Sequence, residues 1–295
     1  MGRGDDLGPH PVNDRIAIVG LGLIGGSLAR DLAALGAHVL GFDTDAGALA
    51  AAIELGAVHE VLPLDSGALA SADLDALVLA VPLQSAVPLL SVAAPHLARV
   101  PLVTDVGSTK ATITATASSL GLGDRFVGSH PVAGSHLSGW GASRPGLFRG
   151  ARVYLCPSPE VGQSAGEEAD RDALSRASSL WTAVGALPET IDAAAHDRLL
   201  AWTSHLPQVA STALALALAG SGIRPGDLGS GGRDMTRLAA SSSSLWTGIA
   251  LDNARALSEG VVALETELAK LRESLERGDG NAVHAFFSGG ASWRE

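Results

Sequence analysis

A chain of 295 residues is long enough for two domains that each bury a hydrophobic core. Its formal net charge of -11, with lysine confined to Lys110 and Lys270, excludes broad affinity for nucleic acid, because phosphate binding requires clustered cations. Apolar residues make up 46% of the chain, yet its longest apolar stretch, residues 209–219, is far shorter than the roughly 20 residues of a membrane span.

The N-terminal segment, residues 1–13, is polar and carries glycine and proline, so we expect a flexible tail. It lacks the apolar core of a signal peptide. The single cysteine, Cys156, excludes an internal disulfide and a cysteine-rich zinc site, and we interpret it as a small buried residue of a strand. We therefore expect a cytoplasmic protein with no metal, membrane or nucleic-acid partner.

A dinucleotide-binding pattern follows the tail. Residues 15–19 and 38–42 are β-rich runs, and residues 27–35 between them have helical spacing. The sequence GLGLIG joins the first run to the helix: its first glycine makes a tight turn, its second lets the backbone approach a pyrophosphate, and its third allows close helix packing. The residues predicted to hold the cofactor at this helix N-terminus are Gly20, Gly22, Leu23, Ile24 and Gly25.

The residue after the second β-rich run indicates which dinucleotide binds. Asp43 stands where a carboxylate can accept hydrogen bonds from both ribose hydroxyls and would repel a 2′-phosphate. The next residue is Thr44 rather than an arginine that could hold such a phosphate. NAD is therefore predicted over NADP, with the alternative that Asp43 only caps the following helix.

Four more strands are predicted, at residues 76–81, 101–106, 126–128 and 152–156, and they alternate with helices. This alternation predicts a mostly parallel sheet. After Pro188, alanine- and leucine-rich helices dominate, interrupted by a glycine-rich stretch. We expect an α/β dinucleotide-binding domain at residues 14–189 and an almost all-helical domain at residues 190–295.

Residues just past three predicted strands are candidates for function, because ligands bind beyond the carboxyl ends of strands in open α/β sheets. Val81 and Pro82 form an apolar turn that we expect to pass under the cofactor. Ser108 lies on a turn next to a glycine, near the expected nicotinamide, and His130 lies among small residues.

Five motifs together resemble the prephenate and arogenate dehydrogenases, the oxidoreductases of tyrosine biosynthesis. The resemblance spans nearly the whole chain from Arg15 to the helices after Trp246. The resemblance implies a Rossmann-type NAD-binding domain and a helical domain, similar to the C-terminal domain of 6-phosphogluconate dehydrogenase, through which two subunits form a homodimer. The motifs are GLGLIGGS (20–27), DVGSTK (105–110), SHPVAG (129–134), SHLP (204–207) and RDMTR (233–237).

The resemblance also implies catalytic roles. His130 looks like the catalytic histidine, which takes a proton from the substrate's C4 hydroxyl as hydride leaves that carbon for NAD; a neutral imidazole suits this task at neutral pH. Ser108 looks like the hydroxyl that bridges His130 and the substrate oxygen, and it could also cap the next helix. Once C4 is a ketone, loss of CO2 makes the ring aromatic, so the protein need only start the oxidation.

Three residues look like substrate contacts of the family. Arg237 matches a carboxylate-binding arginine, whose planar guanidinium can grip a carboxylate through two hydrogen bonds. His205 matches a position near nicotinamide and substrate, and Trp246 a position near the active site. Without the resemblance we would interpret them as a surface arginine, a core histidine and a core tryptophan.

Other family-like positions receive structural interpretations. We interpret His196 and Asp197 as the start of a helix. We interpret Lys110 as an exposed lysine or one that bonds the backbone.

Two departures from the family affect substrate choice. His136 stands where prephenate-using members commonly carry a glutamate, and Gln208 where a second histidine commonly follows SHLP. With glutamine in place of that histidine, the site lacks a potential cation that would attract a second carboxylate. The two substrates differ in that arogenate has an amine where prephenate has a keto group. We expect oxidative decarboxylation of prephenate, with arogenate as the alternative.

Two other classes fit parts of the sequence. A different two-domain hydroxyacid or imine dehydrogenase would share the glycine turn but would place a catalytic lysine or aspartate in the first long helix of its second domain. A non-catalytic NAD-binding regulator would keep the glycines but has no reason to hold Ser108, His130 and Arg237 together.

Overall fold

A computed structural model describes residues 14–62, 73–134, 137–158 and 167–294. The chain divides into two compact units: unit 1 comprises residues 1–197 and 241–252, and unit 2 comprises residues 198–240 and 253–295. The predicted tail and His136 lie outside the described residues. The predicted domain boundary stays a prediction.

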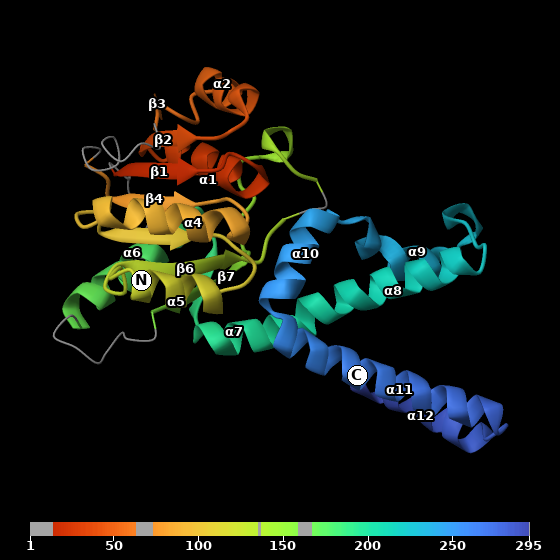
Figure 1. The fold of residues 1–295 in the computed structure, drawn as a ribbon. Coiled ribbons are helices and arrows are strands. Elements are labelled where there is room, and N and C mark those ends of the chain that lie inside the picture. Colours follow the sequence, from red (N-terminus) through yellow and green to blue (C-terminus); the bar gives the residue numbers. More distant parts are fainter. Residues whose placement is uncertain (1–13, 63–72, 135–136, 159–166, 295) are drawn as a thin grey trace, which may run out of the picture. The chain divides into compact units, whose positions relative to one another are not determined.

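Unit 1 is built on an eight-stranded sheet with the order β3-β2-β1-β4-β5-β6-β7-β8 (Figure 1). All neighbouring strands pair in parallel except β6 and β7, which are antiparallel. The predicted mostly parallel sheet is therefore confirmed. The strands are β1 (Arg15–Val19), β2 (His38–Phe42), β3 (Glu60–Val61), β4 (Ala76–Leu79), β5 (Leu102–Asp105), β6 (Phe126–Pro131), β7 (Arg152–Pro157) and β8 (Leu187–Thr190).

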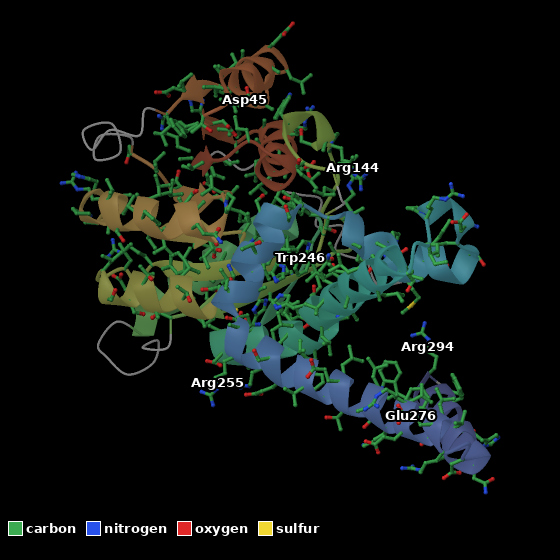
Figure 2. All side chains as sticks on the ribbon, turned by 45° about the vertical axis from the view of Figure 1, so that its right-hand side comes forward. Asp45, Arg144, Trp246, Arg255, Glu276 and Arg294 are labelled. Carbon is green, nitrogen blue, oxygen red and sulfur yellow. The ribbon has the colours of Figure 1, made fainter. Side chains whose placement is uncertain are left out.

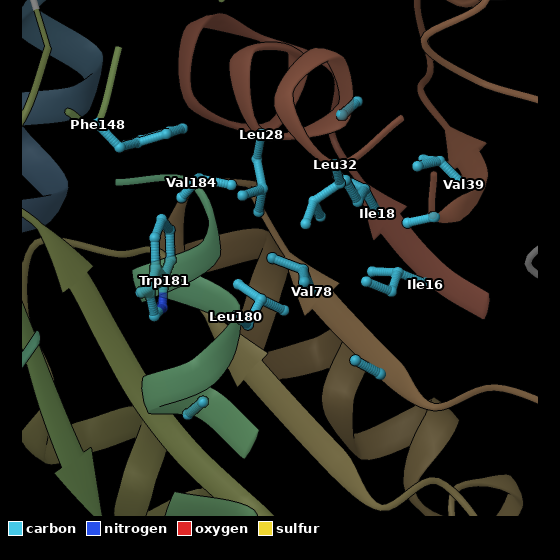
Figure 3. Packing of buried hydrophobic residues seen from close by; sticks show 14 of the residues in the cluster. Ile16, Ile18, Leu28, Leu32, Val39, Val78, Phe148, Leu180, Trp181 and Val184 are labelled. Atoms are coloured by element: carbon cyan, nitrogen blue, oxygen red, sulfur yellow. The ribbon is translucent and has the colours of Figure 1, made fainter. Parts of the chain in front are cut away.

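Helices cover both faces of this sheet, and alternate residues of β1 explain why. Ile16 and Ile18 point into a core shared with α1 (Leu23–Ala34) and α6 (Glu167–Ala183), where Trp181 is fully buried (Figure 3). Ala17 and Val19 point into a second core, shared with α4 (Leu83–Ala93) and α5 (Ala111–Ser119). Because successive side chains of a strand point to opposite faces, one apolar strand supports both layers.

Two further helices belong to unit 1 although they lie apart in the sequence. Helix α2 (Ala46–Glu54) follows β2, whereas α10 (Ser243–Asp252) comes from the C-terminal third of the chain. Thr112 Oγ1 donates to Asp252 Oδ1 at 2.7 Å, which joins α5 to the end of α10. The pattern of apolar residues in the sequence does not predict that α10 belongs to unit 1.

Unit 2 is all-helical in its described residues, as predicted. Its helices are α8 (Leu206–Gly220), α9 (Ser230–Thr236), α11 (Ala254–Glu276) and α12 (Gly280–Arg294). Helix α7 (Ala193–Leu200) leads into α8 through a π-helical turn, η3 (Ala201–His205).

The two C-terminal helices pack on each other and carry both charged and apolar surface residues. Arg255 and Glu276 lie near the two ends of α11 (Figure 2). Several large apolar side chains of α11 and α12 are exposed, among them Val262, Leu268 and Phe287. None of the described helices is both long and apolar enough to span a membrane.

Candidate functional site

The glycine turn has the geometry that a dinucleotide requires. Gly20 adopts φ +97°, and a side chain on Gly20 or Gly25 would collide with backbone oxygens at 2.4 and 1.9 Å. In contrast, a side chain on Gly22 would meet nothing within 4 Å. Gly20 and Gly25 therefore permit the tight packing of α1, while Gly22, at the N-cap, leaves open space at the helix N-terminus. Leu23 and Ile24 form the first turn of α1, whose free N–H groups favour a phosphate.

The carboxylate after β2 braces this turn. Asp43 Oδ2 accepts from Leu21 N at 2.6 Å, and Oδ1 accepts from Asp45 N at 2.8 Å. The next helix is capped by Asp45, whose side chain accepts from Gly47 N and Ala48 N. Asp43 is therefore not the cap of α2, a position that Asp45 occupies, and its predicted ribose contact stays a prediction.

Val81 and Pro82 lie where β4 leads into α4. Val81 packs under the glycine turn, since its Cγ1 lies 2.8 Å from the position a Gly20 side chain would take. Pro82 is the N-cap of α4 and is exposed. Both residues are beside the turn that would hold a cofactor, at the point where the strand order reverses between β1 and β4.

The segment after β5 contains a buried ion pair. Lys110 is fully buried, and its Nζ contacts Asp105 Oδ2, which also accepts from Gly107 N at 2.8 Å. Burial raises the pKa of the Asp105 carboxyl, and the Lys110 ammonium and the Gly107 N–H oppose that shift. The interpretation of Lys110 as an exposed lysine or one that bonds the backbone is therefore wrong: its ammonium pairs with the Asp105 side chain, which also accepts from Gly107 in the turn that carries Ser108.

A hydrogen-bonded chain of three side chains ends at His130. His130 Nδ1 lies 2.9 Å from His196 Nε2, and His196 Nδ1 lies 2.8 Å from Asp197 Oδ1. A carboxylate can only accept, so neutral His196 carries its proton on Nδ1 and accepts at Nε2. His130 therefore donates from Nδ1, which leaves its Nε2 as a proton acceptor.

Asp197 also fixes the helix that follows the Ser108 turn. Its two oxygens accept from Lys110 N at 2.8 Å and from Ala111 N at 2.9 Å, at the N-terminus of α5. Although burial alone would raise the pKa of Asp197, the hydrogen bonds from His196 and these backbone N–H groups hold it below its ordinary value. The sequence indicated only a structural role for His196 and Asp197, because His130 and His196 are 66 positions apart in the chain and their contact is not visible in a local pattern.

Ser108 is half-buried on the turn between β5 and α5. Its side chain is not the N-cap of α5, which is Lys110. Within the described residues, Ser108 Oγ makes no hydrogen bond. Its hydroxyl is thus unused by the fold, and its predicted bridge between His130 and a substrate oxygen stays a prediction.

In unit 2, the predicted His205 ends the π-helical turn and is buried. The extra residue of a π turn rotates the side chains that follow, and such turns are frequent at functional sites. Asn253 Nδ2 lies 3.2 Å from His205 Nδ1. Since an amide nitrogen only donates, the neutral ring carries its proton on Nε2. Asn253 is a residue that sequence reasoning missed.

Gln208 makes a hydrogen bond to the backbone of the residue that follows Arg237. Gln208 Nε2 donates to the oxygen of Leu238 at 2.8 Å, and Leu238 follows Arg237 in the short helix η5 (Arg237–Ala240). Arg237 is exposed and makes no ion pair or hydrogen bond with any described residue. Its guanidinium is available to an anion.

Two remaining features belong to unit 1. Trp246 is half-buried on α10 (Figure 2).

A cavity of about 230 Å³ is lined by Asp14 and Asp75, which precede β1 and β4. Burial, together with Asp75, raises the pKa of Asp14 above its ordinary value. This cavity lies at the amino ends of the strands, so it is separate from the cofactor turn at their carboxyl ends.

Comparison with known families covers nearly the whole chain. Residues 28–187 match the model of the prephenate dehydrogenase nucleotide-binding domain, and residues 192–288 match that of the prephenate dehydrogenase dimerization domain. The prephenate dehydrogenase of Bacillus subtilis is 30% identical, over 97% of this chain and 76% of its own length.

Two solved structures are similar throughout. Synechocystis arogenate dehydrogenase is 31% identical with a TM-score of 0.76, covering 95% of this chain and 98% of that one. Prephenate dehydrogenase from A. aeolicus, in complex with hydroxyphenyl propionate and NAD+, is 26% identical with a TM-score of 0.80, covering 95% and 97%. The glycine turn, the histidine of β6 and the all-helical second unit agree with these matches, and the chain belongs to the prephenate dehydrogenase family.

Proposed function

We propose that this protein catalyses the NAD-dependent oxidative decarboxylation of a prephenate-type substrate: prephenate itself or, as the alternative, arogenate. The observation that carries the proposal is the chain Asp197–His196–His130, which leaves Nε2 of His130 as a proton acceptor. Removal of the C4 hydroxyl proton is the acid–base step of this reaction.

Each of the proposed catalytic residues of unit 1 has its own role. His130 takes the hydroxyl proton at Nε2, while His196 and Asp197 hold its ring in the tautomer that can do so. Ser108, whose hydroxyl has no hydrogen-bond partner among the described residues, bridges His130 and the substrate oxygen. Bound NAD+ supplies the hydride acceptor. Oxidation at C4 makes the ring carboxylate labile, because its loss as CO2 leaves an aromatic ring.

Several residues hold the two ligands. The open space at Gly22 and the N-terminus of α1 receive the pyrophosphate, and Asp43 accepts from the ribose hydroxyls and selects NAD over NADP. Arg237, with no partner among the described residues, grips a substrate carboxylate. His205 contacts nicotinamide or substrate, and Trp246 contributes to the substrate site.

We propose a homodimer formed through the helical domain. The exposed apolar residues of α11 and α12 support this proposal, because exposed apolar patches mark interaction surfaces. The dimerization-domain match supports it too.

The proposal is tested by following absorbance of the reduced nicotinamide with prephenate and arogenate in parallel, each with NAD+ and with NADP+. We expect NADH and CO2 in equal amounts with at least one substrate, and a much slower reaction with NADP+. Absence of NADH with both substrates would refute the proposed reaction. Equal rates with the two cofactors would refute the role of Asp43.

A further inference from the structure

Helix α8 carries two buried oxygen atoms that the fold leaves unused. Gln208 and Ser211 are 6% and 3% exposed, and neither Gln208 Oε1 nor Ser211 Oγ has a hydrogen-bond partner among the described residues. Their separation of three positions places them on one face of the helix. A buried polar group without a partner is unfavourable, so a native structure that keeps two of them together calls for an explanation.

The orientation of the Gln208 amide is fixed by its neighbours. Nε2 donates to the carbonyl of Leu238 at 2.8 Å and lies 3.5 Å from Thr212 Oγ1. The Thr212 hydroxyl already donates to the carbonyl of Gln208 at 3.0 Å, so it can only accept from Nε2. Both hydrogens of the Gln208 amide thus face acceptors. Oε1 of the same amide is an acceptor and needs a donor.

Ser211 differs from several other hydroxyl residues of unit 2. Thr212, Ser221 and Ser274 each donate to the carbonyl four residues earlier, at 2.9 to 3.1 Å, which is the usual way to satisfy a hydroxyl in a helix. Ser211 Oγ has no such bond. Its hydroxyl, which can both accept and donate, is a second buried polar group without a partner among the described residues, on the same face of α8 as Gln208.

We propose that Gln208 and Ser211 bind the ammonium group of an α-amino-acid side chain, and that the preferred substrate is therefore arogenate. This inference rests on the proposed function, in which Arg237 binds a substrate carboxylate. Gln208 donates to the carbonyl of Leu238, the residue that follows Arg237, so an acceptor for ammonium and a cation for carboxylate come from adjoining segments of unit 2. A keto group cannot satisfy Oε1, because both are acceptors without a proton.

The first test compares kcat/KM for the two substrates in the full-length protein. We expect arogenate to exceed prephenate about 10-fold or more, as a hydrogen bond to a charged group implies. Gln208→Met, which keeps the length of the side chain but removes its acceptor, should erase most of this preference. Gln208→His should raise prephenate use relative to arogenate. A preference for prephenate in the unchanged protein, or an equal loss with both substrates in Gln208→Met, would overturn the inference.

A binding test needs no turnover. L-tyrosine and 3-(4-hydroxyphenyl)propanoate differ only in the ammonium group, and calorimetric titration of the NAD-bound protein gives the Kd of each. We expect L-tyrosine to bind about 10-fold more tightly or better. Gln208→Met should remove most of the difference and Ser211→Ala part of it, whereas Ser258→Ala, on the exposed side of α11, should leave it intact.

The controls separate the possible failures. Melting temperature and NAD affinity show that each variant is folded. If neither substrate yields NADH, the proposed function fails and this inference with it. If NADH forms but the two analogues bind equally, the proposed function stands and the ammonium site is refuted.

Discussion

The two units treat their buried polar side chains in opposite ways. In unit 1, Asp197, His196 and His130 form a chain in which each link has a defined donor and acceptor. In unit 2, Gln208 and Ser211 keep buried oxygens without a partner among the described residues. The fold therefore fixes the acid–base group before any substrate binds, while the face of α8 leaves polar groups for a ligand to satisfy.

The largest effect should follow from removing the proton acceptor at the end of the unit 1 chain. His130→Asn should lower kcat about 10²- to 10⁴-fold, because general-base catalysis contributes that much. NAD affinity, measured by fluorescence titration, should change little, since the glycine turn is untouched. Turnover close to that of the unchanged protein would remove His130 from the mechanism.

The buried ion pair beneath the Ser108 turn should matter for stability more than any surface pair. Lys110→Met leaves Asp105 buried without its counter-charge and should lower the free energy of unfolding by about 3–5 kcal/mol. The other lysine is a matched control: Lys270 pairs with Glu267 on the exposed surface of α11, and Lys270→Met should cost less than about 1 kcal/mol. Urea unfolding of both variants tests the contrast, which equal losses would contradict.

Replacing His196, the middle residue of the hydrogen-bonded series Asp197–His196–His130, should change only the orientation and tautomer of the His130 ring. His196→Phe keeps a ring against Tyr154 but removes both nitrogens, so His130 loses the acceptor that fixes its tautomer. We expect kcat to fall by up to about 100-fold with KM and NAD affinity little changed. In ¹⁵N NMR spectra, His130 should lose its Nδ1–H form; an unchanged tautomer together with unchanged kcat would show that His196 does not position it.

The smallest expected effect is a change in the free energy of unfolding at acidic pH. The pKa of Asp197 is lower in the folded protein than the ordinary value of about 3.9, so its stabilisation is complete above that value and is lost as pH falls toward the folded pKa. The difference in free energy of unfolding between the unchanged protein and Asp197→Asn should therefore shrink below about pH 4. A difference that stays constant from pH 7 to pH 3 would contradict this assignment.

Much of the fold could be predicted because its signals are local. The glycine turn, the apolar strands and the helical periodicity each occupy a short window, and the structure has strands β1, β2 and β4 to β7 at or near their predicted residues. The short edge strands β3 and β8 were missed, since Glu60–Val61 and the Leu187–Thr190 segment have too few apolar residues to differ from a loop. The return of α10 to unit 1 was missed because it depends on contacts between distant segments.

The candidate site was only partly predictable for the same reason. The sequence by itself determined the glycine turn, the position of Asp43 and a histidine near the carboxyl end of a strand, because backbone conformation and strand ends follow from local residue order. The predicted strand ended at residue 128, whereas β6 continues to Pro131 and so includes His130. Only the tertiary structure brought His196 and Asp197 to His130, buried Lys110 against Asp105, and left Oε1 of Gln208 without a partner in the part of the chain that the structure describes. Hydrogen bonding and burial arise between segments far apart in the chain, so the tautomer of the base and the acceptors of α8 were decided by packing.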